Sequence, residues 1–438
     1  MKLFIREKTV FFAGIMITLL MTAAFVVSIR EWNIAAGLII WLLAGFSFFL
    51  FFKTTGDYLN VRGLFVLCWF FAIGLSAFKI HPLQTQWSII TWLCLWLAAI
   101  AFIFGCEVGG RVKVKTHSIK FIRLSPFLAV VILSAVIIGV FIIEIVEAGG
   151  LPIFSANMYA YKKFGITFLH YVTVTCAIVP ALCISLFYKR IRLRGIRLWV
   201  IIVISLIMLS IPVLIVSRQL LLMECVLAAI VFLEKKGTKK IPLALIIVLV
   251  AAAAAGWIII SMFRNQSDAY LIKQLKLDDK MSPSLYQTYM YFAFNFDSFN
   301  HNIARLTSHT YVLESLTPLW ALTRTQGILE SFIEQPQITP LIKVFTTTPF
   351  IYGPYKDLGI AGVAIYSFVW GFVAGIIEKR RRLFGRYVSH AVMCYCVMFA
   401  FFEAFMSITS IWVYLIGIFL LNMIIADKVS LEAKENNG

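Results

Sequence analysis

The chain has 438 residues, of which 61% are hydrophobic and only 14% are charged, and its mean hydropathy is +0.92. Soluble domains carry roughly 45–50% apolar and about 25% charged residues, so this composition excludes a soluble enzyme, a disordered protein and a disulfide-stapled secreted domain. The apolar residues form unbroken runs of about twenty, which as helices span the hydrocarbon core of a bilayer. Strands of a membrane β-barrel would alternate apolar and polar residues instead. We therefore expect an all-α polytopic membrane protein.

Twelve apolar runs are expected to be transmembrane helices. In chain order they cover residues 10–29, 33–52, 63–79, 87–106, 126–147, 168–188, 198–216, 219–233, 241–262, 358–377, 388–405 and 408–426. The first run follows basic residues, as in a signal peptide, but no clean cleavage site of small residues follows it, so we expect a retained helix. The runs divide the chain into helices one to nine (1–262), a large extracytoplasmic loop (263–357), and helices ten to twelve with a cytoplasmic tail (358–438).

The basic residues are spread unevenly over the loops. When the twelve runs are threaded in order, two thirds of the 39 lysines and arginines lie on the same side as the N-terminus. The positive-inside rule therefore predicts that both termini are cytoplasmic. The same distribution assigns the net charge of +18 to anionic lipid headgroups, so we expect membrane lipid and no nucleic acid as partner.

The eight cysteines lie inside or at the ends of apolar runs, as small buried hydrophobic residues do. Cys394 and Cys396 form a C-x-C pair, but no second cluster of cysteine or histidine at metal-ligand spacing accompanies it. We therefore expect no disulfide framework, no metal and no other cofactor.

Two arginines border apolar runs on the predicted outer side. Arg218 lies in the tight turn before run 219–233, and Arg264 closes run 241–262. A guanidinium binds phosphate oxygens through two parallel N–H donors, so the pair could hold one diphosphate headgroup. The alternative is that both arginines are independent interface anchors whose charged ends snorkel to the surface.

Four acidic residues lie in or near the apolar runs: Glu144, Glu147, Glu224 and Glu403. Glu144 and Glu147 are one helical turn apart near the outer end of run 126–147. A proton-coupled transporter uses such groups. The favoured interpretation is that these acids pair with arginines such as Arg218.

The long loop 263–357 contains equal numbers of acidic and basic residues, and half of the residues in 286–299 are aromatic. This pattern predicts an amphipathic helix that lies on the bilayer or forms a lid packed over the bundle. Asp297, His301 and Arg305 share one face if this segment is helical. An aspartate that orients a histidine would form a general base, with Arg305 adding positive charge, whereas the alternative is an ordinary solvated face.

The loop ends in the sequence TTTPFIYGPYKDLGIAGVAIYSFVWGFVAG, in which proline and glycine predict turns just before run 358–377. Lys356 and Asp357 are expected at the start of that helix, where backbone N–H groups favour anions. Gly371 and Gly375 form a G-x-x-x-G motif, which predicts a close-packing helix face.

A resemblance to a known family rests on three short segments. They are T-T-T-P-F-x-Y-G-P-Y-K-D-L-G-I-A-G, S-R-Q-L-L-L at 217–222, and the arginine that closes the helix before the outer loop. They resemble the oligosaccharide repeat-unit polymerases of the Wzy (O-antigen polymerase) type. The R-x-x-x-L at 218–222 is also similar to an arginine motif of the related O-antigen ligases. The resemblance covers the architecture of the whole chain, but only these short segments carry motifs.

The resemblance implies a GT-C-like glycosyltransferase that polymerises undecaprenyl-diphosphate-linked oligosaccharide units into O-antigen or capsule at the outer face of the bacterial plasma membrane. It implies that Arg218 and Arg264 bind the diphosphate, and that His301, or else Asp297 or Asp357, acts as the base. The implied sugar site is lined by Arg305, Arg324, Tyr352, Tyr355, Lys356 and Asp357. A chain-length regulator and a flippase of the same pathway are implied as partners. No P-loop, GxGxxG or DxD motif indicates a nucleotide-sugar donor, and the related enzymes need no metal.

Three other functions fit the same sequence. An O-antigen-type ligase would differ only in its acceptor. A flippase or transporter of lipid-linked oligosaccharide would suit twelve helices, although the large loop after helix nine breaks a two-fold arrangement. A non-catalytic scaffold of the assembly machinery would tolerate loss of Arg218 or Arg264.

Overall fold

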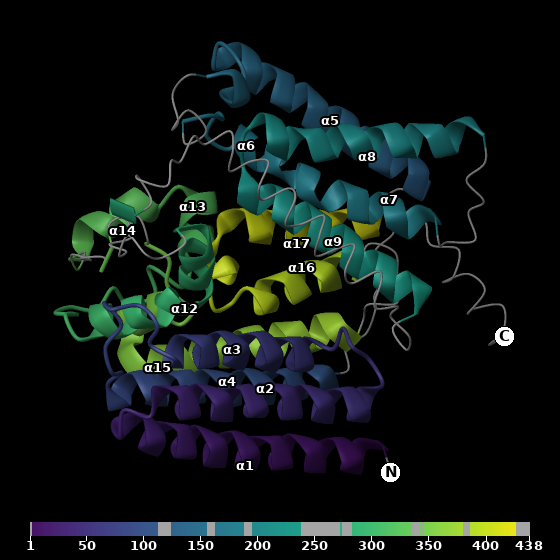
Figure 1. Cartoon of the computed structure of the whole chain (residues 1–438). Helices are drawn as coiled ribbons and strands as arrows, with labels where there is room; N and C mark the ends of the chain where they lie inside the picture. The colour runs from purple at the N-terminus through teal and green to yellow at the C-terminus, as the bar shows by residue number, and fades with distance from the viewer. Residues whose placement is uncertain are drawn as a thin grey trace. The chain divides into compact units, whose positions relative to one another are not determined.

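The computed structural model describes residues 2–112, 124–155, 163–187, 195–237, 272–273, 283–334, 336, 341–342, 346–379 and 386–425 (Figure 1). Helices and the turns between them make up this part of the chain, with an isolated β-bridge between Leu124 and Ile425. Seven of the described helical segments are long and apolar enough to cross a membrane. The expectation of an all-α, multi-pass membrane protein is therefore confirmed.

The chain packs as two compact units. The first unit comprises Met1–Val112, Ser267–Lys379 and Cys396–Ile411, and the second comprises Lys113–Gln266, Arg380–Tyr395 and Trp412–Gly438. The division of the chain at residues 262 and 357 describes how it would cross a membrane, and it stays a prediction. The two units instead describe which residues pack together.

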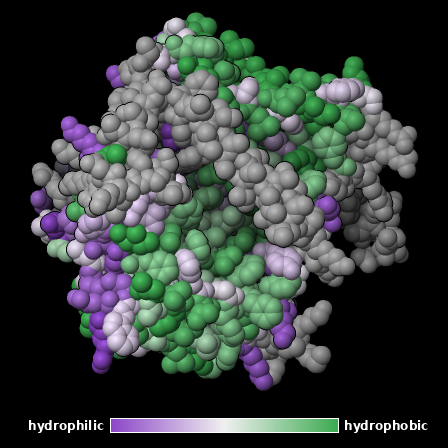
Figure 2. Space-filling view, viewed as in Figure 1, coloured by the Kyte–Doolittle hydropathy of each residue, from purple (hydrophilic) through white to green (hydrophobic). Residues whose placement is uncertain are grey.

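The first unit contains a layer of long helices and a set of shorter ones. Its helices are α1 (Lys2–Ile29), α2 (Asn33–Thr55), α3 (Val61–Ala77), α4 (Ile89–Arg111), α12 (Pro283–Ile303), α13 (Thr317–Thr323), α14 (Gln326–Phe332) and α15 (Tyr352–Lys379). Helix α2 packs between α1 and α3, α4 packs along α15, and α12 packs against α3. Apolar side chains cover the outer faces of α1 and α2, where Phe11 is 73% exposed and Leu42 is 72% exposed. Figure 2 shows this apolar surface between hydrophilic helix ends, as lipid contact requires.

The second unit is built from α5 (Pro126–Glu147), α6 (Leu169–Thr173), α7 (Val179–Phe187), α8 (Ile196–Leu214) and α9 (Arg218–Lys236), with most of α16 (Arg386–Met398) and α17 (Thr409–Ile424). Short 3₁₀ turns lie at η1 (Pro152–Phe154) and η3 (Val174–Ile178), and η4 (Phe405–Ser407) belongs to the first unit. Figure 1 shows the end of α5, the end of α8 and the starts of α6 and α9 at the same end of this unit.

Helix starts follow local capping chemistry. The side chains of Asn60, Ser88 and Ser125 accept hydrogen bonds from the backbone N–H three residues later at the starts of α3, α4 and α5. Pro126 occupies the first turn of α5, where its missing N–H has no cost. These caps satisfy N–H groups that a helix start otherwise leaves unpaired.

Helices α4 and α15 approach closely through glycines on both helices. A Cβ atom on Gly375 would lie 2.2 Å from the carbonyl oxygen of Cys106, and one on Gly109 would lie 2.0 Å from that of Phe372. Both distances are far below van der Waals contact, so larger residues would push the helices apart. The predicted G-x-x-x-G packing face is confirmed, and Gly105 and Gly109 supply a matching face on α4.

Two predicted helices are interrupted. Run 168–188 is divided into α6, the 3₁₀ segment η3 and α7. Helix α15 begins at Tyr352, earlier than predicted, and its backbone leaves helical geometry at Leu358 and Gly359, where Gly359 has φ +61° and ψ −141°. Lys356 and Asp357 therefore lie on the turn before the interruption and not at the start of the long segment.

The remaining runs agree with the prediction in part. Helix α3 is as long as run 63–79 but begins and ends two residues earlier, and α16 is shorter than run 388–405. Run 241–262 lies outside the described residues. The count of twelve helices and the GT-C-like arrangement thus stay predictions.

Candidate functional site

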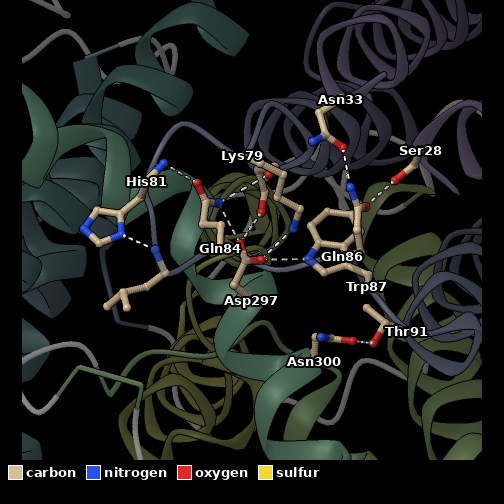
Figure 3. Close-up of polar contacts among 12 residues, drawn as sticks. Ser28, Asn33, Lys79, His81, Gln84, Gln86, Trp87, Thr91, Asp297 and Asn300 are labelled. Atoms are coloured by element: carbon tan, nitrogen blue, oxygen red, sulfur yellow. Dashed lines mark hydrogen bonds and ion pairs between the residues drawn. The ribbon is translucent and has the colours of Figure 1, made fainter. Parts of the chain in front are cut away.

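Asp297 anchors α12 to the loop between α3 and α4. The aromatic helix predicted in the long loop is α12, and it buries Phe294, Phe296 and Phe299 within the first unit. The Asp297 carboxylate is 2% exposed and points into the α3–α4 loop (Figure 3). Helix α12 thus packs against α3 within the first unit, and its role as a lid stays a prediction.

Four donors saturate the Asp297 carboxylate. Lys79 Nζ lies 2.6 Å and Trp87 Nε1 lies 3.0 Å from Oδ1. Ser76 Oγ donates to Oδ2 at 2.9 Å, and Gln84 Nε2 donates to it at 2.7 Å. The Lys79 ammonium also lies 4.0 Å from the centre of the Trp87 ring. Each carboxylate oxygen of Asp297 thus accepts from two donors, and one of the four donors is the charged Lys79 ammonium.

Further hydrogen bonds extend this network along α12. Gln84 Oε1 accepts from the hydroxyl of Tyr289 at 2.6 Å and from the backbone N–H of His81 at 2.9 Å. Burial raises the pKa of the Tyr289 phenol, so Tyr289 remains a neutral donor. Asn300, one turn beyond Asp297, accepts from the Thr91 hydroxyl at 2.7 Å near the start of α4. The network is therefore a joint that connects α12 to the end of α3 and the start of α4.

The predicted pairing of Asp297 with His301 is wrong. Within the described residues, the donors to the Asp297 carboxylate are Ser76, Lys79, Gln84 and Trp87, and His301 is not among them. The His301 imidazole lies instead against the guanidinium of Arg305, with 2.6 Å between Nδ1 and Nη1. The four-residue spacing did place His301 and Arg305 near one another. Helix α12 nevertheless ends at Ile303, before Arg305.

Asp357 holds the loop before α13. Its Oδ1 accepts from the Thr310 hydroxyl at 2.7 Å, and its Oδ2 accepts from the backbone N–H of Ser315 at 2.7 Å. The carboxylate is 1% exposed. The backbone N–H of Glu314 is the third donor to this carboxylate. These three hydrogen bonds occupy the Asp357 oxygens that the predicted role in sugar binding, or as a base, would need.

Lys356 pairs with Glu314 from the same loop, and its ammonium is buried. Phe299 of α12 packs edge-on against the rings of Tyr352 and Tyr355, at 6.2 Å and 5.7 Å between centroids. The structure thus brings Tyr352, Tyr355, Lys356 and Asp357 together around the start of α15. Arg324 lies at the C-terminal end of α13, in a left-handed conformation with φ +59°.

Arg218 opens α9 in the second unit. Its cap is Ser217, whose hydroxyl oxygen accepts from the backbone N–H of Leu220. Arg218 is only 6% exposed, so its side chain is buried and does not snorkel outward. Arg264, predicted to share its site, lies outside the described residues.

Glu144 forms a polar cluster that the sequence analysis missed. Its carboxylate is buried at the end of α5 and accepts from the Ile166 N–H at 3.1 Å and from the Thr173 hydroxyl at 2.7 Å. His170 Nδ1 lies 3.2 Å from one carboxylate oxygen and 3.3 Å from the other. The expectation that Glu144 pairs with an arginine is therefore wrong, because within the described residues its partners are Ile166, His170 and Thr173.

The Glu144–His170 pair has the geometry predicted for Asp297 and His301. A buried carboxylate holds one nitrogen of a partly exposed imidazole, whose side chain is 34% exposed. Glu144 and His170 belong to different helices, so no helical spacing links them in the sequence. The signals in the sequence are the position of each at the end of an apolar run and the Gly-Gly-Leu-Pro segment between them.

The Glu224 carboxylate on α9 is also fully buried. Among the described residues, neither of its carboxylate oxygens has a hydrogen-bond partner. Within the residues that the structure describes, no group of three or more His, Cys, Asp or Glu residues is arranged to hold a metal ion.

Comparison with models of known families, with curated proteins and with solved structures finds no match to this chain.

Proposed function

We propose that this protein polymerises oligosaccharide repeat units carried on undecaprenyl diphosphate into O-antigen or capsular polysaccharide. It would act as a GT-C-like glycosyltransferase in the bacterial plasma membrane, with both termini in the cytoplasm and its site at the outer face. The donor is the growing chain on one lipid, and the acceptor is the repeat unit on another. A chain-length regulator and a flippase are the proposed partner proteins.

The burial of Arg218 carries this proposal. A charged side chain costs roughly 2.5–3.5 kcal/mol at the centre of a membrane, so an arginine without a task inside the protein tends to snorkel to the headgroups. Arg218 is instead held inside the second unit at the capped start of α9. A guanidinium at the start of a helix suits a lipid diphosphate, whose negative charge grows as the glycosidic bond breaks.

The residues of the first unit support the sugar side of the proposal. Aromatic rings of Tyr352 and Tyr355 lie at the start of α15 together with Lys356. Aromatic faces stack on sugar rings, and charged groups hydrogen-bond to hydroxyls. The proposed sugar-binding set also includes Arg305, Arg324 and Asp357. The proposed diphosphate site also includes Arg264.

The test is synthesis by the purified protein in lipid vesicles with lipid-linked repeat units. We expect a ladder of polymer lengths from the wild type and at least a hundredfold less polymer from Arg218→Ala, on the order of one lost transition-state donor. Arg218→Lys should recover part of the rate, because lysine keeps the charge but not the two parallel donors.

Arg197→Ala is the matched control. Arg197 is exposed at the start of α8, where its guanidinium lies against the Phe127 ring of α5. The start of α8 is at the opposite end of the second unit from the start of α9, which Arg218 opens (Figure 1). The polymer yield of Arg197→Ala should equal that of the wild type. Normal polymer from Arg218→Ala at normal protein level would remove Arg218 from the site. Transfer of a finished chain to another acceptor, without a ladder, would instead identify a ligase.

A flippase of lipid-linked oligosaccharide is the second candidate, because two described helices are broken. The 3₁₀ segment η3 interrupts the helical run 169–187, and Gly359 interrupts α15. Transporters use discontinuous helices around their substrate and ion sites, and buried Glu224 suits such a site. Movement of labelled lipid-linked oligosaccharide across the vesicle membrane, with no new glycosidic bond, would favour this candidate.

A further inference from the structure

The tautomer of His170 is fixed by Glu144. A carboxylate is an acceptor only, so the contacts of 3.2 Å and 3.3 Å require a proton on His170 Nδ1. The Ile166 N–H and the Thr173 hydroxyl donate to the same carboxylate, so Glu144 acts as the acceptor in each of these contacts. In the neutral imidazole, the lone pair is therefore on Nε2.

The orientation of the ring is fixed as well. A Cβ atom on Gly165 would lie 2.4 Å from His170 Nδ1, so only glycine lets the backbone approach the imidazole this closely. Gly165 has φ +109°, a conformation that glycine adopts without strain. The Phe164 ring packs edge-on against the imidazole with 6.2 Å between centroids. Glu144, Gly165 and Phe164 together leave the imidazole little freedom to turn.

The Nε2 atom is the reactive side of this arrangement. Among the described residues, the hydrogen bonds of the His170 ring are those of Nδ1 to Glu144, and the side chain is 34% exposed. His170 lies at the start of α6 and Arg218 at the start of α9, at the same end of the second unit (Figure 1). A substrate held by Arg218 would thus present its sugars at the end of the unit that carries His170.

We propose that His170 is the general base of the transfer reaction, in place of His301, and that Glu144 is its positioning residue. This inference rests on the proposed function. The acceptor sugar hydroxyl gives its proton to His170 Nε2, and its oxygen forms a bond to the anomeric carbon of the donor sugar. The bond between that carbon and the diphosphate oxygen breaks, and the lipid diphosphate leaves with the electron pair. The imidazolium then releases its proton to water, which restores the base.

The test compares His170→Asn with His301→Asn in the polymerisation assay. Asparagine keeps an amide N–H near the position of Nδ1, so His170→Asn can still donate to Glu144, but it has no counterpart of Nε2. We expect His170→Asn to lower kcat by about 10²- to 10⁴-fold, the usual contribution of a general base. We expect KM to stay near the wild-type value and His301→Asn to remain within about threefold of wild type.

His170→Ala provides an independent readout, because added imidazole can enter the space of the lost ring. Restoration of polymer synthesis by imidazole supports a base at this position, and imidazole should have no effect on Arg218→Ala. Glu144→Gln should lower kcat more than it changes KM, since it disturbs the ring without removing it. A purely structural role would instead lower the melting temperature and leave the kcat of the folded fraction unchanged.

The outcomes separate this inference from the proposed function. If the wild type makes no polymer, the proposed function fails. If the wild type makes polymer and folded His170→Asn retains full kcat, the inference alone is overturned. Loss of activity in His301→Asn, with normal activity in His170→Asn, would return the base to α12. If His170→Asn does not fold, failure of imidazole to rescue folded His170→Ala would overturn the inference.

Discussion

Asp297 in the first unit and Glu144 in the second are both buried carboxylates near helix ends, but their surroundings differ. Asp297 receives two donors on each oxygen, from Ser76, Lys79, Gln84 and Trp87. Glu144 receives donors from the backbone and from Thr173, and it also holds His170, whose other ring nitrogen faces away from it.

We interpret the Asp297 network as a structural joint that holds α12 in place, and the Glu144 cluster as a functional site. A carboxylate whose neighbours are all enclosed stabilises the fold, because every polar atom finds its partner inside the protein. A carboxylate that accepts from Nδ1 of a partly exposed imidazole fixes the tautomer, so that the lone pair lies on the nitrogen that a substrate can reach. The sequence pattern pointed to Asp297, whereas the contacts point to Glu144.

Asp297→Ala should give the largest loss of stability. It leaves the Lys79 ammonium, with a side chain that is 7% exposed, buried without its carboxylate. Removal of one partner of a buried ion pair costs about 3–5 kcal/mol. The check is the free energy of unfolding in detergent or bicelles, and a loss below about 1 kcal/mol would show that the network does not hold α12.

The double variant Asp297→Leu with Lys79→Met sharpens this experiment. Replacing both charges by apolar side chains removes the desolvation cost along with the attraction, and such exchanges are often neutral or stabilising. We expect the double variant to be more stable than Asp297→Ala. The same or lower stability would show that the hydrogen bonds from Gln84 and Trp87, rather than the ion pair, dominate the joint.

Glu144→Gln should have an intermediate effect on stability. Hydrogen bonds to a charged group contribute about 1.5–3 kcal/mol, and the neutral amide weakens those from Thr173 and His170. The melting temperature of the purified variant reports this loss. A variant as stable as the wild type would show that the hydrogen bonds to Glu144 contribute little to folding stability, which would also undermine the assigned tautomer of His170.

Thr173→Val should have the smallest effect of this series. Valine has nearly the shape of threonine, so the change mainly removes the hydroxyl that donates to Glu144 at 2.7 Å. Glu144 keeps its donors from Ile166 and His170, so the expected loss is about 1.5 kcal/mol, the lower end of the range for a hydrogen bond to a charged group. A loss as large as that of Asp297→Ala would show that the Glu144 cluster is a structural joint of the same kind.

The sequence predicted the helices well because lipid imposes a strong and local rule. Apolar runs, capping residues such as Ser88 and Ser125, and the glycines at 371 and 375 all act within a few residues of their own position. The breaks in α15 and in the run that contains η3 were not predicted. Each depends on how the backbone packs against neighbouring segments; Gly362, for example, lies directly against the carbonyl oxygen of Pro354.

The sites were harder to predict because they join distant segments. Lys79 and Asp297 are 218 residues apart in the chain, and Glu144 and His170 are 26 residues apart on two different helices. Helical spacing suggested Asp297 and His301 because both lie on α12, but the position of α12 against α3 turned Asp297 toward the α3–α4 loop. Which face of α12 would be buried depends on tertiary packing that the spacing does not contain.

The most direct test is an electron cryo-microscopy map of the protein bound to a non-reactive analogue of the lipid-diphosphate oligosaccharide. We expect density for the diphosphate against the Arg218 guanidinium and a sugar hydroxyl within hydrogen-bond distance of His170 Nε2. Diphosphate density beside Lys356 in the first unit, with none at Arg218 and His170, would contradict the assignment.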